Sequence, residues 1–532
     1  MMDVQQVRII RERLKYAWTP FFTRFGRLTP IQVATIPPIL DGRNVIVASP
    51  TASGKTEAII APVAERFRKE DWEGLAVLYI VPTRALANDT LARIDGPLRD
   101  MGIKVAIKHG DKPYLSSSKL PNVLITTPES LDSLICRRPE VFRFLRTVIL
   151  DEIHLLDNTY RGDQLQLLLW RLKKLVTDSS YSVHLLSATL SSPHQIAQRY
   201  VSDFEVVTTQ GQRDIDYRLL NSHEEVHRLA REQGVKKLLC FCNLRESVEV
   251  VADELAKLWH PYSVVTHHGS LSRRVREEAE AVMKGADVAV CVATSTLEVG
   301  IDIGDIDLIV LSEPPWSISS LLQRIGRGNR RKHIVHTAVI IKSDEEKLLM
   351  DTMFKVAASG AIPEEPYEAE LSVAVQQVFS FLYQNPQGIS ETLIWELLSP
   401  LCSEDEAKLI LGHLRRNEWI ERRAGQWFAS IKLMDLGEKG RIHSNIPDLQ
   451  TYRVIDVDSG KEIGTIAGIF DEVFVLAGRM WRVVSVENDV IKARRFTGKA
   501  LAPLFQRCIS GGAFYYLLPP ELKGRRLNNK RN

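Results

Sequence analysis

Between residues 45 and 350 the chain repeats one pattern: a short apolar or β-branched run, a polar turn and a helix-like stretch. Near-continuous apolar strands that alternate with helices are typical of parallel sheets covered by helices on both faces. Nine such runs occur, at residues 45–48, 76–81, 123–126, 147–150, 183–187, 237–241, 288–292, 308–311 and 338–341. Because nine strands are more than a single sheet usually contains, we predict an α/β fold with two parallel-sheet domains, joined by the polar stretch 208–217.

Beyond residue 360 the pattern changes. Three helix-like segments and a hairpin follow, at residues 371–383, 390–398, 403–416, 418–422 and 426–430. This order predicts a winged helix, a variant of the helix-turn-helix. Residues 452–496 then alternate with a period of two and predict a small antiparallel, barrel-like β module. The predicted parts are therefore two α/β domains, a winged helix, a β module and a basic tail, at residues 1–210, 211–360, 366–440, 445–520 and 521–532.

The composition narrows the class of protein. Among 532 residues, 69 Lys and Arg against 66 Asp and Glu leave a net charge of +3, which excludes a histone-like polycation. Six scattered cysteines without a CxxC pair argue against a disulfide framework and against a zinc site. No segment approaches the ~18 apolar residues that span a bilayer, and the N-terminal residues lack the apolar core of a signal peptide. We therefore expect a soluble, cytoplasmic protein, associated with the nucleoid if the source is prokaryotic, with no membrane partner.

Residues 49–56 read Ser-Pro-Thr-Ala-Ser-Gly-Lys-Thr, between an apolar run and a helix-like stretch. Strand, loop and helix in this order form the setting of a phosphate-binding loop, where backbone N–H groups and a helix N-terminus cradle phosphates. In that setting Lys55 reaches the β and γ oxygens, and Thr56 binds Mg²⁺. Ser49 stands where the strict pattern has Gly, so the alternative is a chance Gly-Lys-Thr at a helix start.

Asp151 and Glu152 follow the apolar run 147–150. Carboxylates at the carboxyl end of a parallel strand point into the crevice where ligands bind. Asp151 would hold Mg²⁺, and Glu152 would orient or deprotonate the attacking water. Alone, the pair would indicate a helix cap. Together with Lys55 and Thr56 it predicts a phosphoryl-transfer site.

Residues 323–330 read Gln-Arg-Ile-Gly-Arg-Gly-Asn-Arg. Arg327 and Arg330 are three residues apart, so they share a helix face and can stabilise charge that develops on a γ-phosphate. The alternative is a solvated basic helix end. The two interspersed glycines favour close approach of the backbone to a ligand.

The order of these motifs resembles that of superfamily 2 helicases of the DExH-box type, with two RecA-like lobes, and more narrowly that of the large helicase-related (Lhr) family. Gln32 matches the adenine-reading glutamine of the first lobe. The other matching segments of that lobe are residues 82–87, 126–129, 151–154 and 187–189. In the second lobe they are residues 241–243, 267–273, 293–302 and 323–330.

The resemblance implies that ATP and Mg²⁺ bind between the lobes. It also implies that ATP hydrolysis moves the lobes along single-stranded DNA in the 3′ to 5′ direction, and that this movement unwinds tailed duplex or RNA–DNA hybrid. It implies hydrolytic roles for Glu152, Gln323, Arg327 and Arg330. Nucleotide-binding roles fall to Gln32, Ser53, Gly54, Lys55, Thr56, Gly300 and Asp302, and Mg²⁺ to Thr56 and Asp151. Contacts with the nucleic-acid backbone fall to Pro82, Thr83, Arg84, Thr127, Ser270, Ser272 and Thr294, and coupling to His154, Ser187 and Thr189.

Two departures from the family pattern, Ala52 in the phosphate loop and Gly328-Asn329 before Arg330, remove no functional group. Family cores continue into a further C-terminal domain, so the resemblance implies a shortened relative. Two other functions stay open. The protein is an RNA helicase with the same ATP-driven mechanism, or it is an ATP-gated nucleic-acid-binding scaffold without unwinding activity, within a repair or defence complex.

Aromatic and acidic residues of the C-terminal third have simpler explanations than a further site. We expect Trp395 to lie in a core, whereas Trp419 and Trp427 flank the hairpin, so that base stacking by one of them is a minority interpretation. We expect Asp456 and Asp458 to form a turn rather than a nuclease metal pair.

Overall fold

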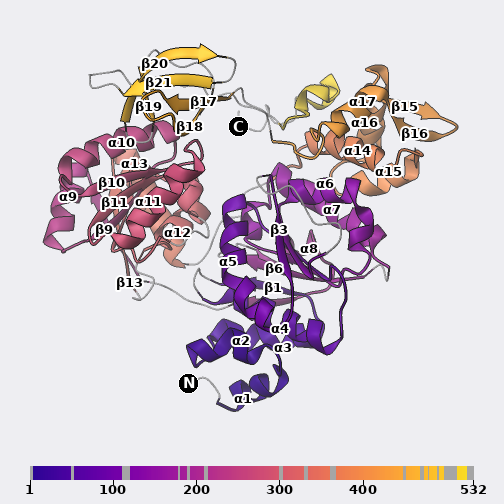
Figure 1. Cartoon of the computed structure of the whole chain (residues 1–532), viewed down its shortest axis with the longest axis horizontal. Coiled ribbons are helices and arrows are strands. Elements are labelled where there is room, and N and C mark those ends of the chain that lie inside the picture. Colours follow the sequence, from indigo (N-terminus) through magenta and orange to yellow (C-terminus); the bar gives the residue numbers. More distant parts are fainter. Residues whose placement is uncertain are drawn as a thin grey trace. The chain divides into compact units, whose positions relative to one another are not determined.

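The computed structural model describes residues 4–49, 53–110, 120–177, 180–187, 192–208, 214–298, 303–328, 334–359, 367–446, 451–467, 473–476, 479–487, 490–495 and 512–523. The chain forms two compact units (Figure 1), each assembled from segments that lie far apart in the sequence. Unit 1 comprises residues 1–210, 364–448 and 509–532, and unit 2 comprises residues 211–363 and 449–508. Within the described part, no helix combines the length and the apolar character that crossing a membrane requires.

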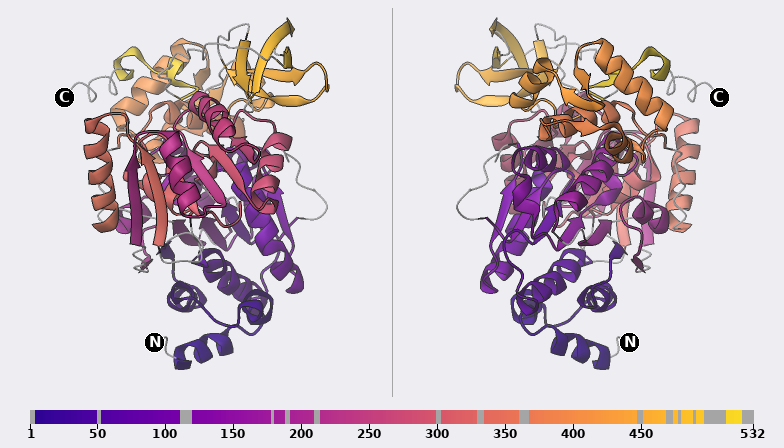
Figure 2. Two further views of the ribbon diagram at one scale, coloured as in Figure 1. Left: turned by 90° about the vertical axis from the view of Figure 1, so that its left-hand side faces the viewer. Right: turned by 90° about the vertical axis from the view of Figure 1, so that its right-hand side faces the viewer.

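Unit 1 is built on a parallel sheet with strand order β3-β4-β2-β5-β6-β1-β7. Its strands are β1 (Val45–Ala48), β2 (Val77–Ile80), β3 (Val105–Lys108), β4 (Val123–Thr126), β5 (Thr147–Leu150), β6 (Ser182–Ser187) and β7 (Glu205–Thr208). The connecting helices are α4 (Lys55–Lys69), α5 (Arg84–Asp100), α6 (Pro128–Arg137), α7 (Tyr160–Leu175) and α8 (Pro193–Gln198). The N-terminal helices α1 (Val4–Arg13), α2 (Trp18–Phe22) and α3 (Pro30–Leu40) lie together at one end of the unit (Figure 2).

Unit 2 contains a second parallel sheet, with order β10-β11-β9-β12-β13-β8. Its strands are β8 (Asp214–Leu220), β9 (Lys237–Phe241), β10 (Ser263–His267), β11 (Ala289–Ala293), β12 (Leu308–Leu311) and β13 (Ile334–Ile340). Its helices are α9 (His223–Glu232), α10 (Arg245–Leu258), α11 (Arg273–Gly285), α12 (Ile318–Ile325) and α13 (Asp344–Ser359). The predicted pair of parallel α/β sheets is confirmed, although part of the expected linker 208–217 belongs to β8.

Residues 372–438 have the element order of a winged helix and belong to unit 1. The elements of this winged-helix region are α14 (Ser372–Gln384), β14 (Ile389–Ser390), α15 (Glu391–Leu398), α16 (Glu404–Arg416), β15 (Ile420–Arg423), β16 (Gln426–Ala429) and α17 (Ile431–Glu438). Ser403 and Glu406 form a capping box at the start of α16. Trp395 packs against the core, while Trp419 and Trp427 are only 9% and 4% exposed, so neither presents a free ring for stacking.

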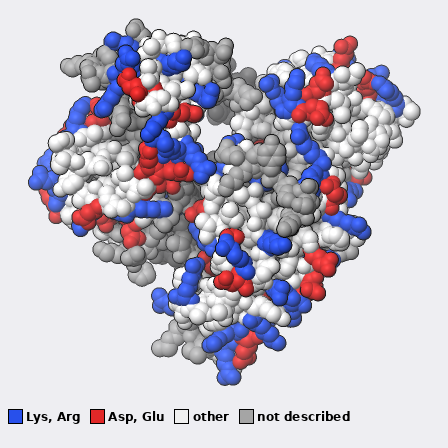
Figure 3. Space-filling model, in the orientation of Figure 1, with Lys and Arg blue, Asp and Glu red and all other residues white. Residues whose placement is uncertain are grey.

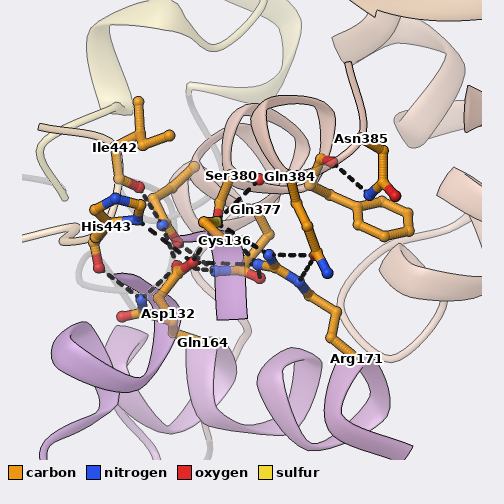
Figure 4. A network of polar contacts seen from close by, with 12 residues as sticks. Asp132, Cys136, Gln164, Arg171, Gln377, Ser380, Gln384, Asn385, Ile442 and His443 are labelled. Carbon is orange, nitrogen blue, oxygen red and sulfur yellow. Dashed lines mark hydrogen bonds and ion pairs between the residues drawn. The ribbon is translucent and has the colours of Figure 1, made fainter. Parts of the chain in front are cut away.

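A buried polar network joins the winged-helix region to α6 and α7 (Figure 4). At its centre, Asp132 Oδ1 accepts hydrogen bonds from Ser380 and from Arg171 Nη1, the latter at 3.2 Å. Asp132 Oδ2 accepts hydrogen bonds from the side-chain amides of Gln164, Gln376 and Gln377 at 3.1, 2.8 and 2.7 Å. Burial alone would raise the pKa of Asp132, but Arg171, His443 and Ser380 hold it well below its usual range.

His443 completes the network, with Nδ1 at 3.6 Å from Asp132 Oδ1. Burial opposes its protonation, but Asp132 and Cys136 outweigh that effect and raise the pKa of His443 to about 9. Ligand atoms of Asp132, Cys136 and His443 lie within 4.8 Å of one another, the spacing of a metal site. However, Arg171 donates to both Asp132 Oδ1 and Cys136 Sγ, and so supplies the positive charge that a metal would bring. We therefore interpret the network as a structural junction.

The β module belongs to unit 2 and contains β17 (Thr451–Asp456), β18 (Glu462–Ala467), β19 (Val473–Leu476), β20 (Arg479–Glu487) and β21 (Val490–Arg495), in the order β18-β17-β21-β20-β19. The sheet is mixed, because β17 and β21 are parallel while the other pairs are antiparallel. The period-two pattern predicted an antiparallel sheet, but side-chain alternation does not specify the direction of the neighbouring strand. Asp456 accepts hydrogen bonds from Asp458 N and Ser459 Oγ, which confirms the predicted turn.

Residues 512–523 return to unit 1 after the β module. Phe514, Leu517, Leu518 and Leu522 are buried in the core of the winged-helix region, and Phe514 packs edge-on against Phe379 at 5.7 Å between ring centroids. Most of the predicted basic tail, residues 524–532, lies outside the described residues. The division of the chain into five domains stays a prediction.

Candidate nucleotide and nucleic-acid sites

The glycine of the phosphate loop is required by its surroundings. Gly54 precedes α4 with φ of 88°, a left-handed conformation that side chains rarely adopt, and a Cβ here would stand 2.4 Å from Gln32 Nε2. Lys55 is buried, and its Nζ donates a hydrogen bond to the Ser49 carbonyl oxygen. These contacts fold the two ends of the loop against each other at the N-terminus of α4, which is the arrangement of a phosphate cradle.

Gln32 lies at the start of α3 and holds the loop in place. Its Oε1 accepts a hydrogen bond from Thr29 N at 2.9 Å, and its Nε2 donates to the Gly54 carbonyl oxygen at 3.3 Å. Thr29 Oγ1 donates to the Ser53 carbonyl oxygen at 2.8 Å. Gln32 thus contacts the loop backbone directly, in addition to the adenine-binding role that the sequence suggests.

Asp151 and Glu152 stand at the carboxyl end of β5, where they are buried. Burial and the neighbouring charge of Glu152 hold the pKa of Asp151 well above its usual range. Tyr79, on β2, donates a hydrogen bond from its hydroxyl to Asp151 Oδ2 at 2.8 Å. Glu152 has φ of 46°, an uncommon left-handed conformation for a residue with a side chain.

This carboxylate pair fits a divalent cation. Two adjacent buried carboxylates, one with a raised pKa, repel each other, and Mg²⁺ would relieve that repulsion while taking the oxygen ligands that it prefers. The Thr56 hydroxyl, in the first turn of α4, is the further oxygen donor that the loop offers. Thr56 Oγ1 accepts a hydrogen bond from Arg93 Nη1 of α5 at 3.3 Å, a partner that the motif did not reveal.

His154 connects the carboxylate pair to strand β6. Its Nδ1 lies 2.9 Å from Ser187 Oγ and 3.5 Å from Glu152 Oε2. The carbonyl oxygen of Ser187 in turn accepts a hydrogen bond from Ser49 N, at the beginning of the phosphate loop, at 3.2 Å. A short path of contacts therefore runs from Glu152 through His154 and Ser187 to the loop. Thr189, the third coupling residue, lies outside the described residues.

The residues of unit 1 that we expect to contact nucleic acid stand at one edge of its sheet. Pro82, Thr83 and Arg84 follow β2, and Thr127 follows the adjacent strand β4. Thr83 and Arg84 are exposed, and Thr83 Oγ1 accepts a hydrogen bond from Leu86 N at 3.2 Å as the cap of α5. These groups lie together because the carboxyl ends of parallel strands meet at the same edge of a sheet.

In unit 2, Ser270 and Thr294 are buried, and Ser270 Oγ accepts a hydrogen bond from exposed Arg245. Ser272 caps α11, its Oγ accepting a hydrogen bond from Val275 N at 3.4 Å. On the face shown in Figure 3, acidic and basic side chains are interspersed over the described parts of both units.

The arginine motif of unit 2 is organised by one residue, Glu298, through its carboxylate and its backbone carbonyl oxygen. Glu298 Oε1 accepts a hydrogen bond from Arg324 Nε at 2.6 Å, and the Glu298 carbonyl oxygen accepts one from Arg327 Nε at 3.0 Å. Gln323 is also buried, and among the described residues no hydrogen-bond partner meets its Oε1. Gly300, Asp302 and Arg330 lie outside the described residues, so their proposed roles rest on the sequence.

Two family models match the chain: DEAD/DEAH box helicase over residues 29–196, and helicase conserved C-terminal domain over residues 221–332. Among curated proteins, the chain is 30% identical to the ATP-dependent helicase Lhr-Core of Methanothermobacter thermautotrophicus, over 91% of this chain and 64% of that protein. It is 28% identical to the protein of the same name from Sulfolobus acidocaldarius, over 90% of this chain and 61% of that protein. The chain thus spans somewhat less than two thirds of these relatives.

Solved structures agree with the sequence relatives. The Mycobacterium smegmatis helicase Lhr bound to ssDNA and AMP-PNP matches 82% of this chain and 62% of its own chain, with a TM-score of 0.71 and 26% identity. The DUF1998 helicase MrfA bound to DNA matches 92% of this chain and 69% of its own, with a TM-score of 0.72. At 20% identity, this second match supports the fold alone.

Proposed function

Because the chain belongs to the Lhr family of superfamily 2 DExH-box helicases, we propose that it hydrolyses ATP and uses the energy to move along a nucleic-acid strand. The observation that carries this proposal is the path from Glu152 through His154 and Ser187 to the phosphate loop. Such a path links Glu152, which would activate water, to Ser187, which would couple hydrolysis to movement of the lobes. In this proposal Lys55 binds the β and γ phosphates, and Asp151 and Thr56 hold Mg²⁺.

We propose single-stranded DNA as the strand, with movement from 3′ to 5′. The M. smegmatis relative was solved with ssDNA, which supports DNA as the substrate. Thr83, Arg84 and Thr127 of unit 1, with Ser270, Ser272 and Thr294 of unit 2, would contact phosphates and not bases, so binding should tolerate any sequence and weaken with salt. Gln323, Arg327 and Arg330 would stabilise the γ-phosphate during hydrolysis.

The test is ATP hydrolysis by the purified protein with no nucleic acid, with single-stranded DNA and with RNA of the same sequence. We expect DNA to raise the rate at least about tenfold, and Lys55→Ala to abolish both rates because the phosphate charge loses its partner. Lys69→Ala, at the exposed end of the same helix, is the matched control. Equal rates with and without nucleic acid would contradict the proposal.

Strand separation needs its own assay, on duplexes with a 3′ or a 5′ tail. Unwinding of the 3′-tailed duplex alone supports the proposed direction. Preference for the RNA strand would identify the same engine as an RNA helicase, since the 2′-OH is the main chemical difference at the backbone. Hydrolysis without separation of any duplex would instead identify an ATP-gated scaffold that acts with partners of a repair or defence complex.

A further inference from the structure

The β module meets the sheet domain of unit 2 at the turn formed by Ser270, Leu271 and Ser272. Ser272 N donates a hydrogen bond to the Ile463 carbonyl oxygen at 3.0 Å. The Ser270 carbonyl oxygen accepts hydrogen bonds from Thr465 N and from Thr465 Oγ1. Leu271 also forms an isolated antiparallel bridge with Gly464. Strand β18 and the turn therefore form a short stretch of antiparallel β pairing.

An apolar contact between Leu271 and the core of the β module stabilises this pairing. Leu271 is only 3% exposed and lies in the core of the β module, with Val454 of β17 and Trp481 of β20. Val275, in the first turn of α11, packs against the same core. Burying one leucine side chain contributes about 2 kcal/mol, so the turn is anchored by its side chain as well as by its backbone.

Gly464 allows β18 to approach the turn closely. A Cβ at this position would stand 2.3 Å from the Ser270 carbonyl oxygen and 3.0 Å from Leu271 Cα. Both atoms belong to the backbone, so a side chain at residue 464 would have to push the turn and β18 apart. Since the φ of Gly464 is not positive, the requirement for glycine is one of space and not of conformation.

Hydrogen bonds within unit 2, one of them to β18, take up the backbone amides of the turn. Leu271 N donates to the His268 carbonyl oxygen, Ser270 N donates to His268 Nδ1, and Ser272 N is used by Ile463. All three turn amides are therefore engaged within unit 2. The guanidinium of Arg245, the hydroxyls of Ser270 and Ser272 and the N-terminus of α11 remain to bind an anion, and their positions follow that of the turn.

We propose that the β module positions this turn, and thereby sets how tightly unit 2 holds the nucleic-acid strand, with Gly464 and Thr465 as positioning residues. This inference rests on the proposed function, because it assigns the turn to the phosphate backbone. It extends that function by giving the β module a part in strand binding that involves no contact between the module and the strand.

The test compares Gly464→Val in the full chain with Gly285→Val. Gly285 ends α11, and a Cβ there meets no atom within 4 Å, so this control makes the same change without a clash. We expect Gly464→Val to raise the DNA concentration for half-maximal ATPase stimulation about tenfold, with basal hydrolysis unchanged. Hydrogen exchange of a peptide covering residues 268–276 should be faster in Gly464→Val alone, because Ser272 N loses its acceptor.

The outcomes separate this inference from the proposed function. If DNA fails to stimulate the wild type, the proposed function fails; exchange that is then faster at the turn in Gly464→Val would still show the module holding it. If DNA stimulates the wild type and Gly464→Val responds like Gly285→Val, the inference is overturned. Weaker DNA response without faster exchange at residues 268–276 also overturns it. Should Gly464→Val fail to fold, Gly464→Ala applies the same test with a smaller side chain.

Discussion

At the residue scale, the contact between His154 and Ser187 is the most informative feature. His154 Nδ1 lies 2.9 Å from Ser187 Oγ and so joins the segment after β5 to strand β6. We predict that Ser187→Ala lowers the DNA-stimulated ATPase rate at least about tenfold while nucleotide binding persists, because the coupling contact is lost and the phosphate loop is not.

The measurement is steady-state hydrolysis with saturating single-stranded DNA, together with nucleotide affinity by fluorescence. Ser182→Ala is the matched control, since Ser182 begins the same strand at its opposite end. A stimulated rate equal to that of the wild type would show that the contact does not transmit the effect of the strand.

Tyr79 offers a second prediction, because it contacts Asp151 without belonging to a recognised motif. Tyr79→Phe removes the hydroxyl that orients the carboxylate and donates to its charged form. We expect the Mg²⁺ concentration for half-maximal ATPase activity to rise about tenfold, as for other partners that orient a metal ligand. Tyr181→Phe, which removes a partly buried hydroxyl bonded to the Leu169 carbonyl oxygen, should leave the Mg²⁺ titration unchanged.

The site illustrates what sequence can predict. Gly54, Lys55, Asp151 and Glu152 were identified because short motifs preserve the spacing between a strand end and its loop. Tyr79 could not be identified, because it reaches Asp151 across 72 positions of sequence and only the pairing of β2 with β5 brings the two together. Contacts made through the sheet register leave no local signal in the sequence.

At the scale of elements, the four strands that the apolar pattern did not reveal are β3, β7, β8 and β10. They are the edge strands of the two parallel sheets. An edge strand has a neighbour on one side only and is less completely covered; β10, for example, begins with exposed Ser263. Its sequence therefore lacks the continuous apolar run by which central strands such as β2 are recognised.

The junction around Asp132 gives a prediction for stability. Arg171→Met leaves the fully buried Asp132 without its guanidinium partner. We therefore expect the free energy of unfolding of unit 1 to fall by about 3–5 kcal/mol. Lys173→Met, an exposed change on the same helix, should cost less than about 0.5 kcal/mol. The measurement is urea denaturation. If the two variants unfold alike, the network does not hold the winged-helix region in place.

His443 adds a pH dependence to the same junction. Its pKa is raised to about 9 in the folded chain, against about 6.5 when unfolded, so its contribution is complete below pH 6.5 and is lost as the pH rises through 9. We expect the wild type to be more stable than His443→Gln by about 2–3 kcal/mol at pH 6, with the difference shrinking as the pH rises from about 6.5 to 9 and nearly gone above pH 9. A difference that stays constant from pH 6 to pH 10 would show that His443 is not held as a cation.

At the scale of the whole molecule, each unit combines one sheet domain with one accessory module: the winged-helix region with unit 1 and the β module with unit 2. Sequence predicted the modules but not this partnership, because it arises from contacts between segments hundreds of residues apart, such as Asp132 with Gln376. No local periodicity encodes which surface a module will cover.

This partnership predicts how distances change when nucleotide and DNA bind. We expect energy transfer between dyes at Arg99 and Lys257, one in each unit, to change on addition of AMP-PNP and DNA. Dye pairs within a unit, Arg99 with Lys408 and Lys257 with Lys461, should not change, because each pair reports on one packed body. A change within either unit would show that the module moves independently of its sheet domain.

The return of residues 512–523 to unit 1 has a consequence for the order in which the chain can fold during synthesis. A ribosome delivers the sheet of unit 1 within the first 208 residues, yet the core of the winged-helix region needs Phe514, Leu518 and Leu522. The β module is completed in the interval, on unit 2. The unit that begins to fold first is therefore the last to be finished, and until then it exposes an apolar surface that chaperones can recognise.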